Sequence, residues 1–243
     1  MLVYAKSDLG KAREKNEDSY YIPNEDSELK IYLLADGMGG YKGGEIASRL
    51  AIESAKRYIE SNFKDIPHDR INIEELIRSS MEYANMVVYE KSKENKELEG
   101  MGTTLEISLV YGNKVYIGHI GDSRIYRIRK NIIRKLTTDH SYVQKLVKEG
   151  TITKEEAEHH PKKNMLLKAL GCTSYVEPDV TTKGFLKEDI LLMSSDGLTN
   201  MISDDEIYDI VTKNKENSTN ILVERANELG GYDNITVVIV YNN

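Results

Sequence analysis

The chain has 243 residues, a formal net charge of −7 and a single cysteine, Cys172. This length fits one domain, residues 1–243, that can bury a large core without a disulfide, and one cysteine suits a reducing, cytoplasmic location. The acidic balance without a dense Lys/Arg block argues against nucleic-acid binding. No apolar run approaches the ~20 residues that span a bilayer, so we expect no membrane partner.

Apolar runs predict a series of short strands. Tyr111-Gly112-Asn113 and Lys130-Asn131 separate consecutive runs and are typical of hairpin turns. Short antiparallel strands at this spacing indicate a sandwich. The predicted strands, in chain order, cover residues 2–8, 18–22, 30–36, 104–111, 114–120, 124–129, 132–136, 179–185, 189–195 and 234–241.

Helical periodicity predicts long helices near the start and the end of the chain. The first two cover residues 44–62 and 73–94, where apolar side chains recur on one face. Ser203-Asp204-Asp205-Glu206 has the capping-box pattern and opens a helix to about residue 213. A last helix covers 217–229, with Gly230-Gly231 ending it. Together with the strands, these helices predict a mixed α+β domain.

Aspartates recur at the ends of the predicted strands. Asp36, Asp122 and Asp196 each follow an apolar run, and Asp233 precedes one. A single Asp-Gly, such as Asp36-Gly37, is most often a turn, but four such positions suggest one shared acidic site. Converging carboxylates repel one another, and divalent cations remove that cost. A set of oxygen donors without clustered Cys or His favours Mg²⁺ or Mn²⁺ over Zn²⁺.

Seven segments resemble, in their order along the chain, the metal-dependent serine/threonine protein phosphatases of type 2C in their compact bacterial form. The resemblance implies a four-layer αββα sandwich, in which two antiparallel sheets are flanked by helix pairs. It also implies that residues 139–171 form a helical flap beside the active site, for which a solvated helical excursion is the alternative. The segments are Arg13 to Asp18, Asp36 to Gly40, Gly102-Thr103-Thr104, Gly121-Asp122-Ser123-Arg124, Asp139-His140, Ser195-Asp196-Gly197 and Asp233-Asn234.

The resemblance implies hydrolysis of phosphoserine and phosphothreonine in proteins by a water that two Mn²⁺ or Mg²⁺ ions activate. The expected partners are phosphoprotein substrates and a cognate bacterial Ser/Thr kinase that the enzyme opposes, and the chain is expected to be a monomer. The alternative is a pseudophosphatase that binds phosphoproteins without turnover. A phosphatase dedicated to one regulatory protein also stays open.

The metal ligands are implied by the same resemblance. Asp36 is expected to bridge both core ions, and the Gly37 carbonyl binds one of them. Asp196 and Asp233 hold the other. Asp122, together with Asp196, matches a third, weaker metal site; alternatively its carboxylate caps the N–H groups of a turn.

Three further positions complete the expected site. Glu17 and Asp18 either bind a metal or steer its waters. Arg13 is expected to bind the phosphate with its planar fork, although it could be a surface residue in a basic stretch.

The general acid stays open in this sequence. Many eukaryotic relatives have His where this chain has Met38, which cannot donate a proton. His140 is one candidate for that role, and a structural role for Asp139-His140 is the alternative. Thr103 and Thr104 are interpreted as support for the site rather than as nucleophiles.

Overall fold

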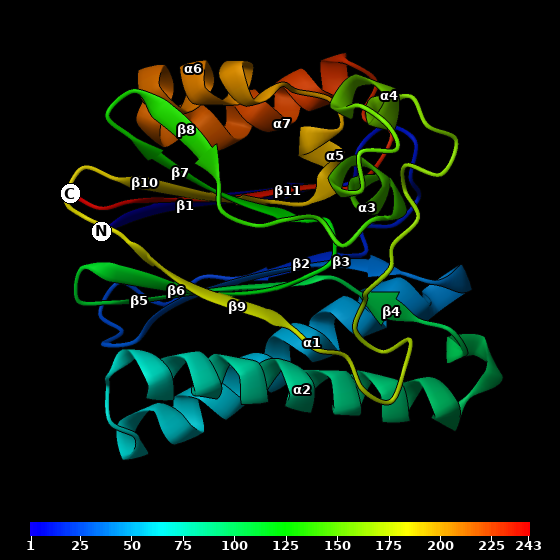
Figure 1. Ribbon diagram of the computed structural model, residues 1–243, viewed down its shortest axis with the longest axis horizontal. Helices are drawn as coiled ribbons and strands as arrows, with labels where there is room; N and C mark the ends of the chain where they lie inside the picture. The colour runs from blue at the N-terminus through cyan, green and yellow to red at the C-terminus, as the bar shows by residue number, and fades with distance from the viewer.

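Two antiparallel sheets lie face to face between two pairs of helices (Figure 1). This computed structural model describes the backbone of residues 1–243 and the side chains of residues 1–39 and 43–243. The α+β class and the αββα layering expected from the resemblance are confirmed. Apolar side chains fill the space between the sheets and the space beneath each helix pair, so the core has three parts.

The first sheet has the order β1-β11-β10-β7-β8, and every pairing is antiparallel. Its inner strand β11 is buried at all seven positions, because the second sheet covers one face and helices cover the other. The strands are β1 Leu2–Asp8, β7 Arg124–Arg129, β8 Ile132–Lys135, β10 Ile190–Ser194 and β11 Ile235–Tyr241. The turn between β7 and β8 places Lys130 and Asn131 at positive φ, as expected for a tight hairpin.

The second sheet has the order β2-β3-β5-β6-β9, and the short strand β4 pairs with the end of β3. Its strands are β2 Asp18–Tyr21, β3 Lys30–Met38, β4 Gly102–Thr103, β5 Leu105–Tyr111, β6 Lys114–Ile120 and β9 Asp179–Gly184. We expected one strand over 104–111. In the structure β5 covers residues 105–111 of this range, and the short β4 before it was not predicted. Thr103 at the end of β4 and Thr104 after it bond to the backbone of Asp36.

The long helices begin earlier than the periodicity predicted. Helix α1 spans Gly40–Asn62 rather than 44–62, because its first turn is rich in glycine and carries no apolar pattern. Helix α2 spans Arg70–Glu94 rather than 73–94, because the side chain of Asp69 accepts the N–H of Asn72 and caps the helix there.

The remaining helices follow the expected pattern. Helix α6 spans Asp204–Asn214, with Ser203 capping its first turn, and α7 spans Ser218–Glu228. The short helix α5, Asp196–Thr199, begins directly after β10 and was not predicted. Within the part of the chain that the structure describes, no helix is both long and apolar enough to cross a membrane.

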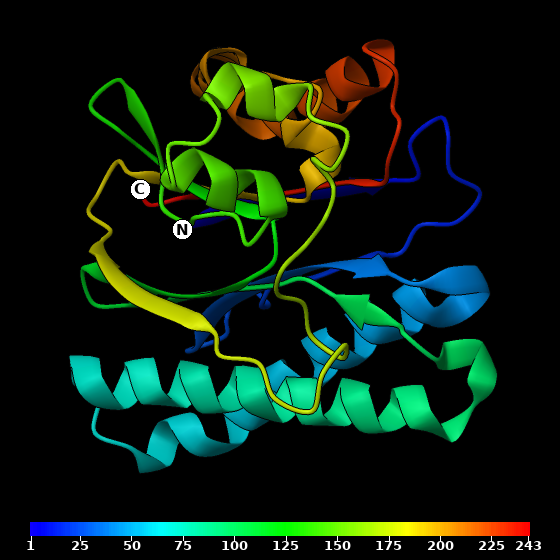
Figure 2. The ribbon, with the colours of Figure 1, turned by 45° about the vertical axis from the view of Figure 1, so that its right-hand side comes forward.

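Residues 139–171 leave the sandwich and carry two short helices, α3 Tyr142–Lys148 and α4 Lys154–Glu158 (Figures 1 and 2). Backbone hydrogen bonds fix the base of this excursion: the N–H of Leu167 donates to His140 at 2.7 Å and that of Tyr142 to Met165 at 2.8 Å. Leu170 exchanges two further bonds with Thr103. Both ends of the segment are therefore anchored beside the end of β3 where Asp36 lies.

Candidate metal centre

The strand ends expected to carry the site meet at one end of the sandwich. Asp36 lies near the end of β3, where two threonines fix its backbone. The Asp36 N–H donates to Thr104 Oγ1 at 2.9 Å, and the Asp36 carbonyl accepts from Thr103 Oγ1 at 2.9 Å. The Thr104 N–H donates to the same carbonyl at 2.9 Å. Both threonines therefore support the site, as the sequence analysis expected.

Asp18 lies directly opposite Asp36 in the register of β2 and β3. Directly opposed side chains share one face of a sheet, so the two carboxyl groups are brought together. Ser195 Oγ donates to Asp18 Oδ2 at 2.8 Å and accepts the N–H of Thr236 at 2.9 Å. This serine connects the second sheet to the first beneath the carboxyl groups.

Asp196 and Asp233 come from the first sheet. A Cβ on Gly197 would lie 2.1 Å from the Asn234 carbonyl, so glycine there lets the segments that carry these aspartates approach closely. Asn200 Nδ2 donates to Asp196 Oδ2 at 3.0 Å. Asp233 Oδ1 accepts the N–H of Asn234 at 2.9 Å.

Arg13 reaches this group from the N-terminal segment. Its guanidinium donates to Asp233 Oδ2 at 2.8 Å, and its side chain is 49% exposed. The ion pair places the guanidinium of Arg13 at the edge of the carboxyl cluster, and part of that guanidinium remains exposed to solvent. The sequence had not indicated this ion pair.

The carboxyl groups interact strongly. Burial of the carboxyl, followed by the charges of Asp18 and Asp196, raises the pKa of Asp36 well above its usual value. Burial raises the pKa of Asp18 to about 7, and burial with the charge of Asp233 raises that of Asp196 to about 6. Burial, followed by the charge of Asp196, raises the pKa of Asp122 to about 8. The five aspartates thus form one electrostatic cluster.

The donor chemistry of this cluster fits hard divalent cations. All five side chains offer oxygen, and Asp18 Oδ1 and Asp196 Oδ1 are buried without a hydrogen-bond partner. A cation would satisfy both atoms and remove the mutual repulsion. Across the side chains of 1–39 and 43–243, however, no three Asp, Glu, His or Cys groups converge closely enough to form a ready-made metal cage. Asp233 is instead held by Arg13.

Glycines make room for Glu17 and for the backbone of Gly37. The Gly37 N–H donates to the Glu17 carbonyl at 3.1 Å. A Cβ on Gly37 would lie 2.2 Å from the Gly44 carbonyl, and one on Gly44 would lie 2.6 Å from Glu17 Cδ. Burial raises the pKa of Glu17.

Asn234 is the residue that sequence reasoning missed. Its Oδ1 accepts the Glu17 N–H at 2.8 Å, and its Nδ2 donates to the carbonyls of Leu9 and Lys15, each at 2.9 Å. One side chain thereby fixes the N-terminal segment that carries Arg13 and Glu17. Its place beside Asp233 was visible in the sequence, but its partners lie more than 200 positions away.

His140 is held as a neutral acceptor. Its Nδ1 accepts the N–H of Gly121 at 3.2 Å, and its ring lies 4.5 Å from that of His119. Burial and the neighbouring His119 lower the pKa of His140 to about 4. Asp139 is bound by Arg124 at 2.8 Å and by Lys135 at 3.1 Å. These contacts favour the structural alternative for Asp139-His140, since a neutral imidazole with this pKa is a poor proton donor at pH 7.

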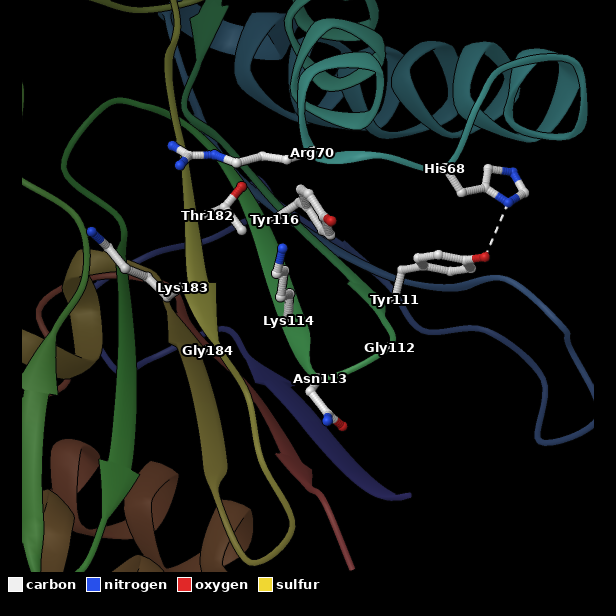
Figure 3. A pocket seen from close by; sticks show the side chains of 10 residues that line it. All are labelled: His68, Arg70, Tyr111, Gly112, Asn113, Lys114, Tyr116, Thr182, Lys183 and Gly184. Carbon is white, nitrogen blue, oxygen red and sulfur yellow. Dashed lines mark hydrogen bonds between the residues drawn. The ribbon is translucent and has the colours of Figure 1, made fainter.

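Cavity size does not identify the site. The cavity of about 460 Å³ in Figure 3 lies at the turn between β5 and β6, and none of the aspartates of the cluster lines it. Asp36, near the end of β3, and Asp122, two residues after β6, lie at the other end of the same sheet. The carboxyl cluster therefore rests on side-chain chemistry rather than on a deep pocket.

Comparison with known proteins gives a consistent result. The family model described as "Protein phosphatase 2C" matches residues 11–228. The serine/threonine phosphatase stp of Listeria welshimeri is 37% identical, covering 98% of this chain and 94% of its own length. Protein phosphatase PhpP of Streptococcus pneumoniae is 40% identical, covering 100% and 98%. The crystal structure of the PstP catalytic domain with two manganese ions has a TM-score of 0.85 at 35% identity, covering 98% of this chain and 96% of that one.

The raised carboxyl pKa values predict how the metal-free protein responds to pH. Asp196, Asp18 and Asp122 have folded-state pKa values of about 6, 7 and 8, against about 4 in an unfolded chain. Between the unfolded and the folded pKa values, the folded state binds more protons than the unfolded chain, so the free energy of unfolding falls as pH rises. In chelator, the urea midpoint should therefore decrease between pH 5 and pH 8.5.

Saturating Mn²⁺ should flatten this dependence, because the cation stabilises the ionised carboxylates. Burial also raises the pKa of Glu106 to about 7, but Glu106 belongs to the core pair with His119 and its contribution should be insensitive to metal. A urea midpoint that does not change over this pH range in chelator would show that the aspartates are not coupled.

Proposed function

The chain belongs to the protein phosphatase 2C family, and from this premise we propose that it hydrolyses phosphoserine and phosphothreonine in proteins with the help of two divalent cations. The observation that carries the proposal is the aspartate cluster, where burial and mutual repulsion raise the pKa of four carboxyl groups. Repulsion of this kind favours cation binding, and a two-cation site is suited to displacement at phosphorus.

In this proposal Asp36, the Gly37 carbonyl, Asp196 and Asp233 would together hold the two cations. The bound cations supply an activated water and offset the charge on the phosphoryl oxygens. Asp18 accepts a hydrogen bond from Ser195, and the backbone of Glu17 is fixed by Asn234. Both carboxyl groups would orient the ligands around the cations. Asp122 is the proposed ligand of a third, weaker cation.

Arg13 is the proposed phosphate-binding residue. Its donors face the cluster through Asp233, and half of its side chain remains exposed. A phosphate dianion would compete for the guanidinium with two oxygens at once, while Asp233 turned to a cation. One side chain would thereby hold the phosphoryl group beside the carboxylates.

Neither Met38 nor His140 is suited to protonate the leaving oxygen of the phosphoester. Met38 has no acidic proton, and the lowered pKa of His140 keeps its ring neutral. We therefore assign the proton of the departing serine or threonine hydroxyl to solvent water.

We extend the proposal to the biological setting. Residues 1–243 form one catalytic domain whose segment 139–171 acts as a flap. The enzyme is a cytoplasmic monomer that uses Mn²⁺ or Mg²⁺ and opposes a bacterial Ser/Thr kinase. A pseudophosphatase would be expected to lose a metal-binding aspartate, whereas Asp36, Asp196 and Asp233 are all present.

Metal removal tests the central part of this function. After thorough chelation, hydrolysis of p-nitrophenyl phosphate should cease, and Mn²⁺ or Mg²⁺ should restore it. Ca²⁺ should restore it poorly because it prefers longer bonds and more ligands. The Asp196→Asn variant should remain inactive at saturating metal. Undiminished hydrolysis by the stripped protein would exclude the proposed chemistry, and inactivity with every cation would favour the pseudophosphatase.

The Arg13→Ala variant separates phosphate binding from metal binding. Because a charge-assisted contact is worth about 1.5–3 kcal/mol, we expect KM for p-nitrophenyl phosphate and Ki for inorganic phosphate to rise about tenfold or more. The Mn²⁺ concentration for half-maximal activity should stay unchanged. Arg225→Ala is the matched control, since it removes an ion-paired arginine from α7. Equal kinetic constants in both variants would return Arg13 to the surface-residue interpretation.

A further inference from the structure

Both sheets end in an open edge on the same side of the sandwich. Strand β8 is the last strand of the first sheet and β9 the last of the second, and both lie at the front of the molecule in Figure 1. A cavity of about 400 Å³ lies between β9 and the segment that follows β8. We call it the edge slot; its lining includes Leu136, Thr137 and Thr138 after β8, and Asp179, Thr181 and Lys183 of β9.

One end of the edge slot lies near the carboxyl cluster. Asp179, at the start of β9, pairs in register with His119 near the end of β6, three residues before Asp122. The carboxylate of Asp179 also lies 3.2 Å from Nε2 of His140. From Asp179 to Lys183 the strand rises by roughly 13 Å at about 3.3 Å per residue. The slot therefore leads from the active-site end of the sheet to Lys183.

The far end of the edge slot is basic. Arg127 and Arg134 are directly opposed in the register of β7 and β8. The carbonyl of Gly184, next to Lys183, accepts from Arg127 at 2.7 Å and from Arg129 at 3.1 Å. We call Arg127, Arg129, Arg134 and Lys183 the basic cluster. Residues from three strands thus bring four positive charges to one corner of the sandwich.

Most of this charge is not neutralised. Asp189 pairs with Arg129, but Arg127 Nε is buried without a hydrogen-bond partner. Among the side chains that the structure describes, none forms an ion pair with Arg134 or Lys183. Like charges directly opposed on a sheet are destabilising, and burial with the neighbouring arginines lowers the pKa of Arg127. On a chain of net charge −7, such a corner is complementary to an anionic partner.

Lys183 lines the edge slot and also the cavity of about 460 Å³, whereas Lys114 on the adjacent strand lines the second of these two but not the slot. Figure 3 shows Lys183 and Lys114 on opposite sides of the β9 ribbon, with Lys114 beside Tyr116. Lys114 lines the cavity of about 460 Å³ and pairs in register with Gly184. The two lysines therefore lie at the same corner and share one cavity, but only Lys183 lines the edge slot, which makes Lys114 the control for it.

We infer that the edge slot binds an extended, acidic segment of the phosphoprotein substrate, with its carboxylates at the basic cluster and its phosphorylated residue at the aspartates. This inference rests on the proposed phosphatase function. An extended segment suits the slot because the outer edge of β9 has no neighbouring strand. Acidic residues should help only at a distance of four or more residues from the phosphorylated one. Glu177 and Asp179 line the near end, and Arg78 there already donates to the Pro178 carbonyl and pairs with Glu75.

Three phosphothreonine peptides test the inference with the full chain and Mn²⁺. One has a Glu-Glu pair five to eight residues from the phosphothreonine, on the N-terminal or C-terminal side in separate versions. The second has Gln-Gln there, and the third has Glu-Glu next to the phosphothreonine. Of the two versions of the first peptide, we expect one to have a kcat/KM about tenfold above those of the second and third peptides at low salt. This difference should shrink at high salt.

Charge reversal identifies the surface. Lys183→Glu combined with Arg134→Glu should abolish the preference for the distal Glu-Glu peptide, whereas Lys114→Glu should retain it. All variants should hydrolyse p-nitrophenyl phosphate at the wild-type rate, which also shows that they fold. Equal kcat/KM for the distal Glu-Glu and Gln-Gln peptides would overturn the inference, as would an equal loss in Lys114→Glu. A wild-type protein that fails on p-nitrophenyl phosphate would instead contradict the proposed function.

Discussion

The repulsion among clustered, half-buried aspartates is the constraint on which the rest of the structure depends. Asp36 and Asp18 lie side by side on neighbouring strands of one sheet. The charges of Asp196, Asp233 and Asp122 all act on Asp36 as well. Carboxyl groups in this arrangement either bind protons or bind cations. The fold holds the carboxyl groups together without neutralising them, so protons or cations must come from solution. This is the condition expected of a site that is completed by metal.

The scaffold resists this repulsion with neutral hydrogen bonds rather than with cations. Thr103 and Thr104 fix the backbone of Asp36, and Ser195 joins the carboxylate of Asp18 to the backbone of the other sheet. Asn234 fixes the N-terminal segment. A lysine or arginine buried in these places would neutralise the aspartates and compete with a metal. Arg13 contacts the cluster directly through Asp233, and it approaches from the exposed rim.

Local patterns predicted the parts of the site that depend on one strand end, and missed those that join distant segments. Asp36, Asp196 and Asp233 stood out because each adjoins an apolar run. The bond from Asn234 to Lys15 and the pair of Arg13 with Asp233 could not be read from the chain, since each joins its two ends. The start of α1 at Gly40 was missed because a glycine-rich turn has no periodicity. The αββα layering came from the resemblance, since strand spacing alone does not fix how sheets stack.

Proton release during Mn²⁺ binding tests the central claim most directly. Calorimetric titrations at pH 7 in two buffers of different ionisation enthalpy give the number of protons displaced per Mn²⁺ bound. Because the pKa values of Asp18 and Asp122 are raised to about 7 and 8, binding should displace protons at pH 7 and almost none at pH 9.5. Tight Mn²⁺ binding at pH 7 without proton release would contradict the account, since the carboxyl groups would then already be ionised and uncoupled.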